Sequence, residues 1–416
     1  MDGIRSFLSP RHHMSLPRVI CIVLFPLTTV TVRGDDLLDR VDEALTFAGF
    51  DDRLRVRFSG MLDLEYYNFS GAVPGLLFTD DHDLLNPRLT LFCDAQLGPR
   101  FYAFAQARVD QGFDPSPEPI GIRLDEYAVR WTPADEGYFN LQVGRFATVV
   151  GNYVERHLSW ENPFINAPMI YENMTRIYDA EPPPDAQTFG EGDSKYDFNP
   201  VIWGPSYATG IAVSGKLGKF DYAAELKNAS LSSRPESWDA TGIGFDYPTV
   251  SAHLAYHPTM AWTLGVSASE GPYLTEQAQS GLPPGTGLGN FREYVLGQDL
   301  GFAWDHWQLW AEVYEARFEV PNVGNADTLG YYLEAKYKFT PSLFAALRWN
   351  QQFFADVPDG KGGEQPWGNN LSRLDAAMTY RFTPNTQLKL QYSVQHEDQV
   401  DDAISHLVAA QFTLRF

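Results

Sequence analysis

The stretch Thr328–Phe339, TLGYYLEAKYKF, decides the fold class, because apolar and polar residues alternate along its whole length. In an extended chain one face would carry Leu329, Tyr331, Leu333, Ala335, Tyr337 and Phe339, and the other Gly330, Tyr332, Glu334, Lys336 and Lys338. A period of two is typical of a β-strand with one apolar and one polar side. A strand of about ten residues with this pattern fits the wall of a membrane β-barrel, which meets lipid outside and water inside.

The same alternation recurs from Arg53 to the end of the chain, most clearly at 373–382 and 387–394. A soluble β-sandwich would seldom repeat it so often. The pattern therefore predicts an all-β chain that forms a membrane-spanning, antiparallel, up-and-down β-barrel.

Turn residues divide the barrel region, 52–416, into strands. Roughly seven connections are short and roughly eight are long, which joins about sixteen strands and places both ends beside the short turns. Weak alternation at 122–131 and 292–304 leaves about fourteen to eighteen strands possible. The short turns are predicted at 97–100, 131–133, 217–219, 257–259, 304–306, 339–341 and 382–384. The long loops are predicted at 67–84, 110–121, 146–206, 229–249, 269–292, 319–327, 350–370 and 396–405.

The N-terminal region, 1–34, reads as a cleaved export signal. Its apolar run Val19–Val32 follows Arg18 and is shorter than the ~20 residues that a membrane-spanning helix needs. Met14 is an alternative start, and a buried N-terminal strand is the alternative structure. After the signal, apolar residues at helical spacing predict a short amphipathic helix over 35–51, periplasmic or luminal.

The amino-acid composition narrows the range of possible partners and cofactors. The 416 residues carry a net charge of −22, which disfavours nucleic acid as a partner. Of the two cysteines, Cys21 leaves with the signal and Cys93 remains alone, so we expect no disulfide within the mature chain. We find no phosphate-binding glycine loop, paired-cysteine metal spacing or haem motif, and expect no metal or other cofactor.

Two local clusters raise the possibility of an enzyme. Asp80-Asp81-His82-Asp83 could bind a cation or act as an outer-membrane protease site, but it reads more simply as an acidic loop tip. His157 and Ser159 lie close in sequence without an evident third member, so a nucleophile is not supported. We expect no catalytic site.

The C-terminal segment Leu407–Phe416 alternates and ends on an aromatic residue. It resembles the C-terminal signature of bacterial outer-membrane proteins, which implies that Phe412, Leu414 and Phe416 are recognised by the barrel-assembly machinery. The long loop 146–206 follows the fifth strand, where general porins carry a constriction loop. Gly144-Arg145 is similar to strand ends of phosphate-selective porins.

The chain thus resembles a bacterial outer-membrane porin. This resemblance implies an outer-membrane location amid lipid and lipopolysaccharide, a possible homotrimer, and passive diffusion of small hydrophilic solutes or ions. A scaffold for another envelope protein is the alternative function, and a hydrolase is a weaker one.

A selective pore needs charges in its lumen. Arg53, Arg55 and Arg57 alternate with apolar residues and would stack three guanidinium groups on the luminal face, or else sit at the periplasmic rim beside lipid phosphates. The predicted pore-lining residues are Arg53, Arg55, Arg57, Arg145, Arg373, Arg381 and Lys389. The predicted constriction-loop residues are Glu155, Arg156, Glu161, Glu172 and Arg176.

Overall fold

The computed structural model describes residues 44–416 except 51–52, 72–74, 78, 80, 111–120, 135–136, 193, 235–243 and 401–402. The predicted export signal and residues 35–43 of the predicted helix lie outside the described residues, as do parts of several predicted loops.

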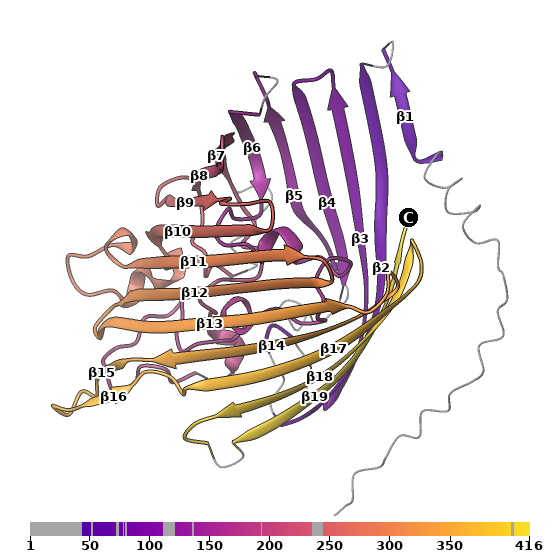
Figure 1. Ribbon diagram of the computed structural model, residues 1–416. Helices are drawn as coiled ribbons and strands as arrows, with labels where there is room; N and C mark the ends of the chain where they lie inside the picture. The colour runs from indigo at the N-terminus through magenta and orange to yellow at the C-terminus, as the bar shows by residue number, and fades with distance from the viewer. Residues whose placement is uncertain are drawn as a thin grey trace, which may run out of the picture.

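Sixteen antiparallel strands form a closed ring, as the sequence pattern predicts (Figure 1). Each strand pairs with its neighbours in chain order, and β19 pairs with β2 to close the barrel. The strands are β2 (Leu54–Ser70), β3 (Asp83–Leu97), β4 (Phe101–Asp110), β5 (Gly121–Trp131), β6 (Asn140–Phe146), β7 (Ala208–Leu217), β8 (Phe220–Lys227), β9 (Thr249–Tyr256), β10 (Trp262–Pro272), β11 (Arg292–Trp304), β12 (Trp307–Val320), β13 (Gly324–Lys338), β14 (Leu343–Phe354), β17 (Leu371–Thr383), β18 (Thr386–Glu397) and β19 (Ile404–Arg415).

The connections alternate between the two ends of the barrel, which we call the turn side and the loop side. The predicted turns lie on the turn side, and the predicted long loops lie on the loop side. One loop prediction, 319–327, is wrong, because β12 runs to Val320 and β13 begins at Gly324. Asn322 and Gly324 adopt positive φ angles of 62° and 123°, which lets the chain reverse within a tight turn.

The end of the predicted helix over 35–51 is also wrong, because Thr46–Gly49 forms a strand, β1. β2 extends beyond the end of β19, where Phe416 lies opposite Gly60. The backbone groups of Leu54–Arg57 therefore lack a partner from β19, and β1 pairs with them in antiparallel register. Satisfying this strand edge outweighs a short stretch of helical periodicity.

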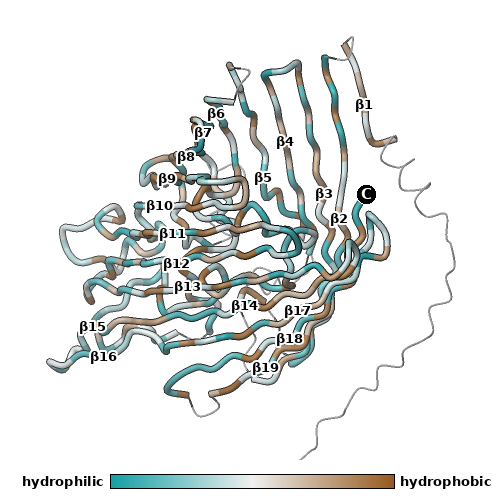
Figure 2. Tube along the Cα trace, in the orientation of Figure 1, coloured by the Kyte–Doolittle hydropathy of each residue, from teal (hydrophilic) through white to brown (hydrophobic). Residues whose placement is uncertain are grey.

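The two faces of the wall differ in chemistry, as the alternating colours along the strands show (Figure 2). On β2, Leu64 and Tyr66 are exposed outward, whereas Asp63 and Glu65 are buried inside the ring. Exposed aromatic residues gather near the turn side, as expected where a barrel wall meets the membrane interface. They include Trp262, Trp304, Trp307, Phe339, Tyr380 and Phe382. No helix in the described part of the chain is long and apolar enough to cross a membrane.

The connection between β6 and β7, residues 147–207, is the longest and lies inside the ring; we call it the lumen loop. It contains three short 3-10 turns, Val154–Arg156, Met169–Tyr171 and Lys195–Asp197. Its buried apolar residues pack with inward-facing aromatic residues of the wall, for example Ile170 and Tyr171 in one cluster with Tyr314 and Tyr332. The lumen loop therefore gives the barrel an internal core.

The remaining short elements lie on the loop side. The connection from β14 to β17 forms a small hairpin of β15 (Asp356–Pro358) and β16 (Glu364–Pro366). Two further 3-10 turns, Glu276–Gly281 and Leu288–Asn290, occupy the connection from β10 to β11.

Candidate functional site

Lys389 on β18 is a buried cation that binds the lumen loop. Its side chain is fully buried, and its ammonium donates hydrogen bonds to the carbonyl oxygens of Ser159 (3.0 Å), Asn162 (2.7 Å) and Phe164 (2.9 Å). It also donates to the Gln411 side chain at 3.0 Å. A single lysine thus holds three successive points of the lumen loop against the wall.

Strands β13, β14 and β17 hold the loop through buried ion pairs. Arg373 contacts the loop residue Glu172 at 2.6 Å, and the loop residue Arg156 contacts Glu334 at 2.6 Å. Arg348 is fully buried, pairs with Asp375 at 2.9 Å and donates to the carbonyl oxygens of Asn166 and Ala167. Burial of a charge costs free energy unless the charge is paired and hydrogen-bonded, and these groups are paired and hydrogen-bonded on both sides of the contact.

On β12, Glu312 anchors the start of the loop. Its carboxylate accepts hydrogen bonds from the backbone N–H groups of Asn152 (2.5 Å) and Tyr153 (3.0 Å) and from the Tyr171 hydroxyl (2.7 Å). The adjacent Gly151 has a φ of +74°, and a Cβ there would lie 2.0 Å from the Tyr314 hydroxyl oxygen. Only glycine permits this close approach of the loop to the wall.

The wall formed by β2 to β5 carries a second set of ion pairs. Arg88 contacts Asp63 at 3.2 Å and Glu65 at 2.6 Å, and Arg108 contacts Asp125 at 2.9 Å. The lumen loop reaches this wall through the Ser159 hydroxyl, which donates to Asp63 at 2.9 Å. The loop therefore contacts several sides of the ring and crosses the lumen.

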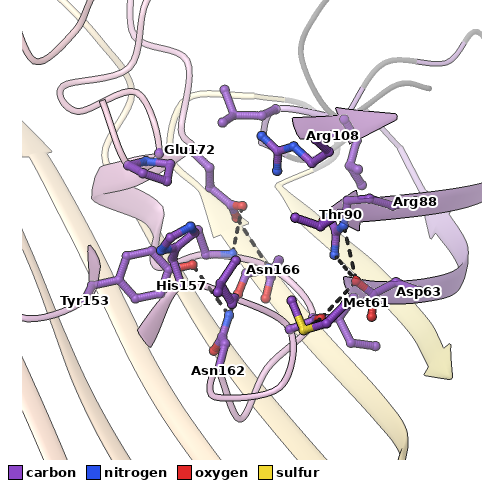
Figure 3. Close-up of a pocket in the computed structure, with 18 of the residues that line it drawn as sticks. Met61, Asp63, Arg88, Thr90, Arg108, Tyr153, His157, Asn162, Asn166 and Glu172 are labelled. Atoms are coloured by element: carbon purple, nitrogen blue, oxygen red, sulfur yellow. Dashed lines mark hydrogen bonds and ion pairs between the residues drawn. The ribbon is translucent and has the colours of Figure 1, made fainter. Parts of the chain in front are cut away.

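A small cavity of about 70 Å³ remains between the loop and this wall. Figure 3 shows its side chains converging: Arg88, Arg108 and Asp63 from the wall, and His157 and Glu172 from the loop. Cations and carboxylates thus face one another across the narrow space.

His157 is the titratable loop residue in this cavity. Its ring contacts the Tyr207 hydroxyl at 2.8 Å and the Val154 carbonyl oxygen at 2.5 Å. Burial lowers the pKa of His157 to about 4, so the imidazole is neutral around pH 7.

Two larger cavities lie on either side of the lumen loop. The loop-side cavity measures about 700 Å³ and is lined in part by Arg176, Lys195 and Arg373. The turn-side cavity measures about 860 Å³ and is lined in part by Glu155 and Glu161. The lumen therefore consists of two open mouths separated by the lumen loop.

This architecture matches known structures more than known sequences. No protein-family model matches the chain, and no curated protein matches it. The anion-selective porin from Comamonas acidovorans superposes with a TM-score of 0.54 at 11% sequence identity, over 87% of this chain and 100% of that chain. The fold is that of the outer-membrane porins.

Further solved structures agree. Salmonella typhi OmpF in complex with daunomycin matches with a TM-score of 0.54 at 13% identity, over 89% of this chain and all of that chain. The outer-membrane channel DcaP of Acinetobacter baumannii matches with a TM-score of 0.52 at 12% identity, with coverage of 89% and 100%. At these identities the likeness establishes the porin fold alone.

The predicted loop residues fall at different depths of the porin-fold barrel. Arg156 and Glu172 are buried and bind the wall, as described above. Glu155 and Glu161 are exposed to the turn-side cavity, and Arg176 lines the loop-side cavity.

The predicted pore residues divide in the same way. Arg145, Arg373 and Lys389 are buried within the lumen, whereas Arg381 lines the turn-side cavity. The residues of the arginine triplet, Arg53, Arg55 and Arg57, are exposed at the turn-side end of β2. Strand alternation places the triplet on the same face as Asp63.

The predicted assembly signal lies on the last strand. Phe412 is exposed on the outer face, and the ring of Phe416 covers Gly60, where a Cβ would come within 2.6 Å of it. Phe416 exchanges backbone hydrogen bonds with Gly60 of 3.0 and 2.9 Å, so the last residue completes the seam of the barrel.

Sequence reasoning missed several charged residues of the lumen, including Arg88, Arg108 and Arg348 and their partners Asp63, Asp125 and Asp375. The alternation contained a usable signal, because Arg108 lies between Ala107 and Val109 and so must face away from lipid. Their pairing depends on register between strands and could not be derived from a single strand.

Proposed function

We propose that this protein is an outer-membrane channel for passive diffusion of small hydrophilic solutes or ions, with the lumen loop as its narrowest part. The observation that carries this proposal is a closed barrel with a charged interior, crossed by a loop that is tied to the wall at Lys389, Arg348 and Glu312. A barrel of this strand number encloses space for water, and a tethered loop supplies the restriction.

The arrangement favours small solutes. With the loop in place, about 70 Å³ remains free beside the wall of β2 to β5, compared with the much larger mouths on either side. A solute would pass between Arg88 and Arg108 on the wall and Glu172 on the loop, or would require the loop to move. In this proposal Arg373 and Lys389 hold the loop, and Arg381 and the arginine triplet act at the turn-side mouth.

The two residues that raised the possibility of a hydrolase support the channel instead. The Ser159 hydroxyl donates to Asp63, and the His157 ring contacts Tyr207 and Val154, so the two side chains serve separate anchoring contacts. Ser159 and His157 share no hydrogen bond, so this histidine does not activate this serine as a nucleophile.

Planar-bilayer recording of the folded protein tests the channel, and Glu312→Gln tests the role of the loop. The amide cannot accept the two backbone N–H groups and the Tyr171 hydroxyl as strongly as the carboxylate, which loosens the loop. We expect single-channel steps that grow at least about twofold, or become frequent where the wild type is mostly closed, because each lost charge-assisted hydrogen bond removes about 1.5 to 3 kcal/mol.

Glu315→Gln is the matched control, because Glu315 lies on the same strand with its side chain exposed on the outer face. It should conduct as the wild type does. Absence of ion conduction in both the wild type and Glu312→Gln, from barrels that migrate as folded in cold electrophoresis, would remove the channel proposal.

The outer-membrane location is part of the same proposal. It rests on the export-signal pattern of 1–34, the exposed apolar wall and the seam made by Phe416. Membrane fractionation tests it: we expect the protein in the outer-membrane fraction, and Phe416→Ser to lower its amount severalfold. Recovery in the inner membrane would contradict this location.

The neighbouring structures also bear on assembly. One Vibrio cholerae outer-membrane protein of the same fold was solved in a trimer form. A homotrimer of this chain is included in the proposal, and the mass of the complex in detergent would test it.

A further inference from the structure

The turn-side cavity contains an uncommon set of cations. Lys336, Lys338, Arg381 and Arg415 project inward from β13, β17 and β19, and none of the four forms an ion pair with any residue that the structure describes. Two loop carboxylates, Glu155 and Glu161, line the same space, and neither has an ion-pair partner among the described residues. In a chain whose net charge is −22, this mouth therefore has a local excess of positive charge.

Aromatic rings hold these cations in place. Arg415 and Arg381 both lie over the ring of Trp160, with centroid distances of 4.1 and 4.8 Å. Lys336 lies over the ring of Phe344 at 4.2 Å. Arg381 also donates to the Gln387 side chain and to the Trp160 carbonyl oxygen, both at 3.4 Å, and Arg415 donates to the Pro384 carbonyl oxygen at 3.0 Å. The rings and these bonds orient the two guanidinium groups, whose other N–H groups remain for an oxyanion.

Lys336 is the clearest indication of a ligand. It is only 7% exposed, yet its ammonium forms no hydrogen bond or ion pair with any described residue. Burial of a charge without a counter-charge is unfavourable, and so is the placement of two guanidinium groups over one indole ring. An anion in the cavity would relieve both costs.

We infer that the turn-side mouth is a binding site for small multivalent oxyanions, that is, solutes with two or more carboxylate or phosphate groups. We name the set Trp160, Lys336, Lys338, Phe344, Arg381 and Arg415 the basic chamber. Guanidinium groups match the geometry of carboxylate and phosphate oxygens, and two of them above one ring can bind two oxyanion groups of a single molecule. The volume of about 860 Å³ accommodates such a solute.

The middle of the lumen has a different construction. In the middle of the barrel Arg88, Arg348 and Arg373 are occupied by Asp63, Asp375 and Glu172. Those cations fix the loop and the strands, whereas the cations of the basic chamber have no ion-pair partner among the described residues. The inference deepens the proposed channel, since it assigns the solute class and places its site on the turn side.

Isothermal titration of pyrophosphate into the detergent-solubilised protein tests the inference without requiring ion conduction. The wild type should bind one pyrophosphate per chain. Lys336→Met keeps the apolar stem and removes the charge, and it should weaken binding at least about tenfold, which is the effect of one lost charge-assisted hydrogen bond. The same variant should unfold at a higher denaturant concentration, because it removes an uncompensated buried charge.

Two further variants complete the design. Glu161→Gln removes a carboxylate from the chamber and should strengthen pyrophosphate binding, a direction that damage to the fold would not produce. Lys216→Met is the matched control, because Lys216 lies at the same end of the barrel, is paired with Asp221 at 3.2 Å and is outside the chamber. Its binding constant should equal that of the wild type.

Three results would overturn the inference: no heat of binding in the wild type with either pyrophosphate or citrate, equal weakening by Lys216→Met and Lys336→Met, or weaker binding in Glu161→Gln. Citrate in place of pyrophosphate identifies the source of the oxyanion groups, and binding of either supports the shared chemistry. If bilayer recordings show no conduction while pyrophosphate binds, the channel fails and the oxyanion site stands.

Discussion

The middle of the lumen and its turn-side mouth use the same residue types for opposite purposes. In the middle, Arg348 is fully buried and every contact that it makes fixes the loop or a neighbouring strand. At the mouth, Arg381 is partly exposed and lies over the ring of Trp160 without an ion pair among the described residues. Where carboxylates surround it, arginine anchors the loop and the strands through ion pairs. Where aromatic rings replace the carboxylates, the guanidinium has N–H groups that can bind a solute.

The difference follows from desolvation. A guanidinium that is withdrawn from water must recover its hydration energy from carboxylates and carbonyl groups, so the central cations carry dedicated partners. A guanidinium that still reaches water at a wide mouth needs no such partner. Substitution of the central cations should therefore lower the free energy of unfolding. Substitution of the cations at the mouth should instead change the binding and selectivity of solutes.

The largest effect should come from Arg348→Met. This change leaves Asp375 with a single arginine partner and removes donors from Asn166 and Ala167. We expect the free energy of unfolding to fall by about 3 to 5 kcal/mol, as for other broken buried pairs. Denaturant titration of the folded barrel in detergent measures it, and a loss below about 1 kcal/mol would contradict the clamp role.

A smaller loss of stability should appear when the pH is lowered. His157 has a pKa lowered to about 4 in the folded loop, against an ordinary value of 6.5, so the unfolded chain binds a proton more readily. The stabilisation is complete above about pH 6.5 and is lost as the pH falls towards 4, by as much as about 3 kcal/mol.

Protease sensitivity of the lumen loop between pH 7 and pH 4 would report this change, because a protonated His157 opposes the buried arrangement with Tyr207. His157→Asn should reduce the difference between the two pH values. An identical pH dependence in the variant would assign it to other groups.

The smallest effect on stability should come from Arg381→Gln in the basic chamber. Because this guanidinium has no ion pair among the described residues, its removal should leave the unfolding midpoint nearly unchanged. Reversal potential under a salt gradient should nevertheless shift towards cations, since the mouth retains Glu155 and Glu161. A large drop in stability without a shift in reversal potential would reverse the comparison between mouth and centre.

The sequence by itself determined the wall. Alternation along Thr328–Phe339 and its counterparts predicts strands, and turn residues predict where they end, because both depend on neighbours along the chain. The same local reasoning was wrong for Thr46–Gly49, where helical spacing yielded to the unpaired edge of β2.

Only the tertiary structure decided what the lumen charges do. Arg373 and Arg381 lie eight residues apart on one strand with the same orientation, yet Arg373 meets Glu172 and Arg381 meets Trp160. Which loop residue reaches which height depends on the path of the lumen loop across the barrel. That path is set by contacts between residues far apart in the sequence, and strand periodicity carries no information about them.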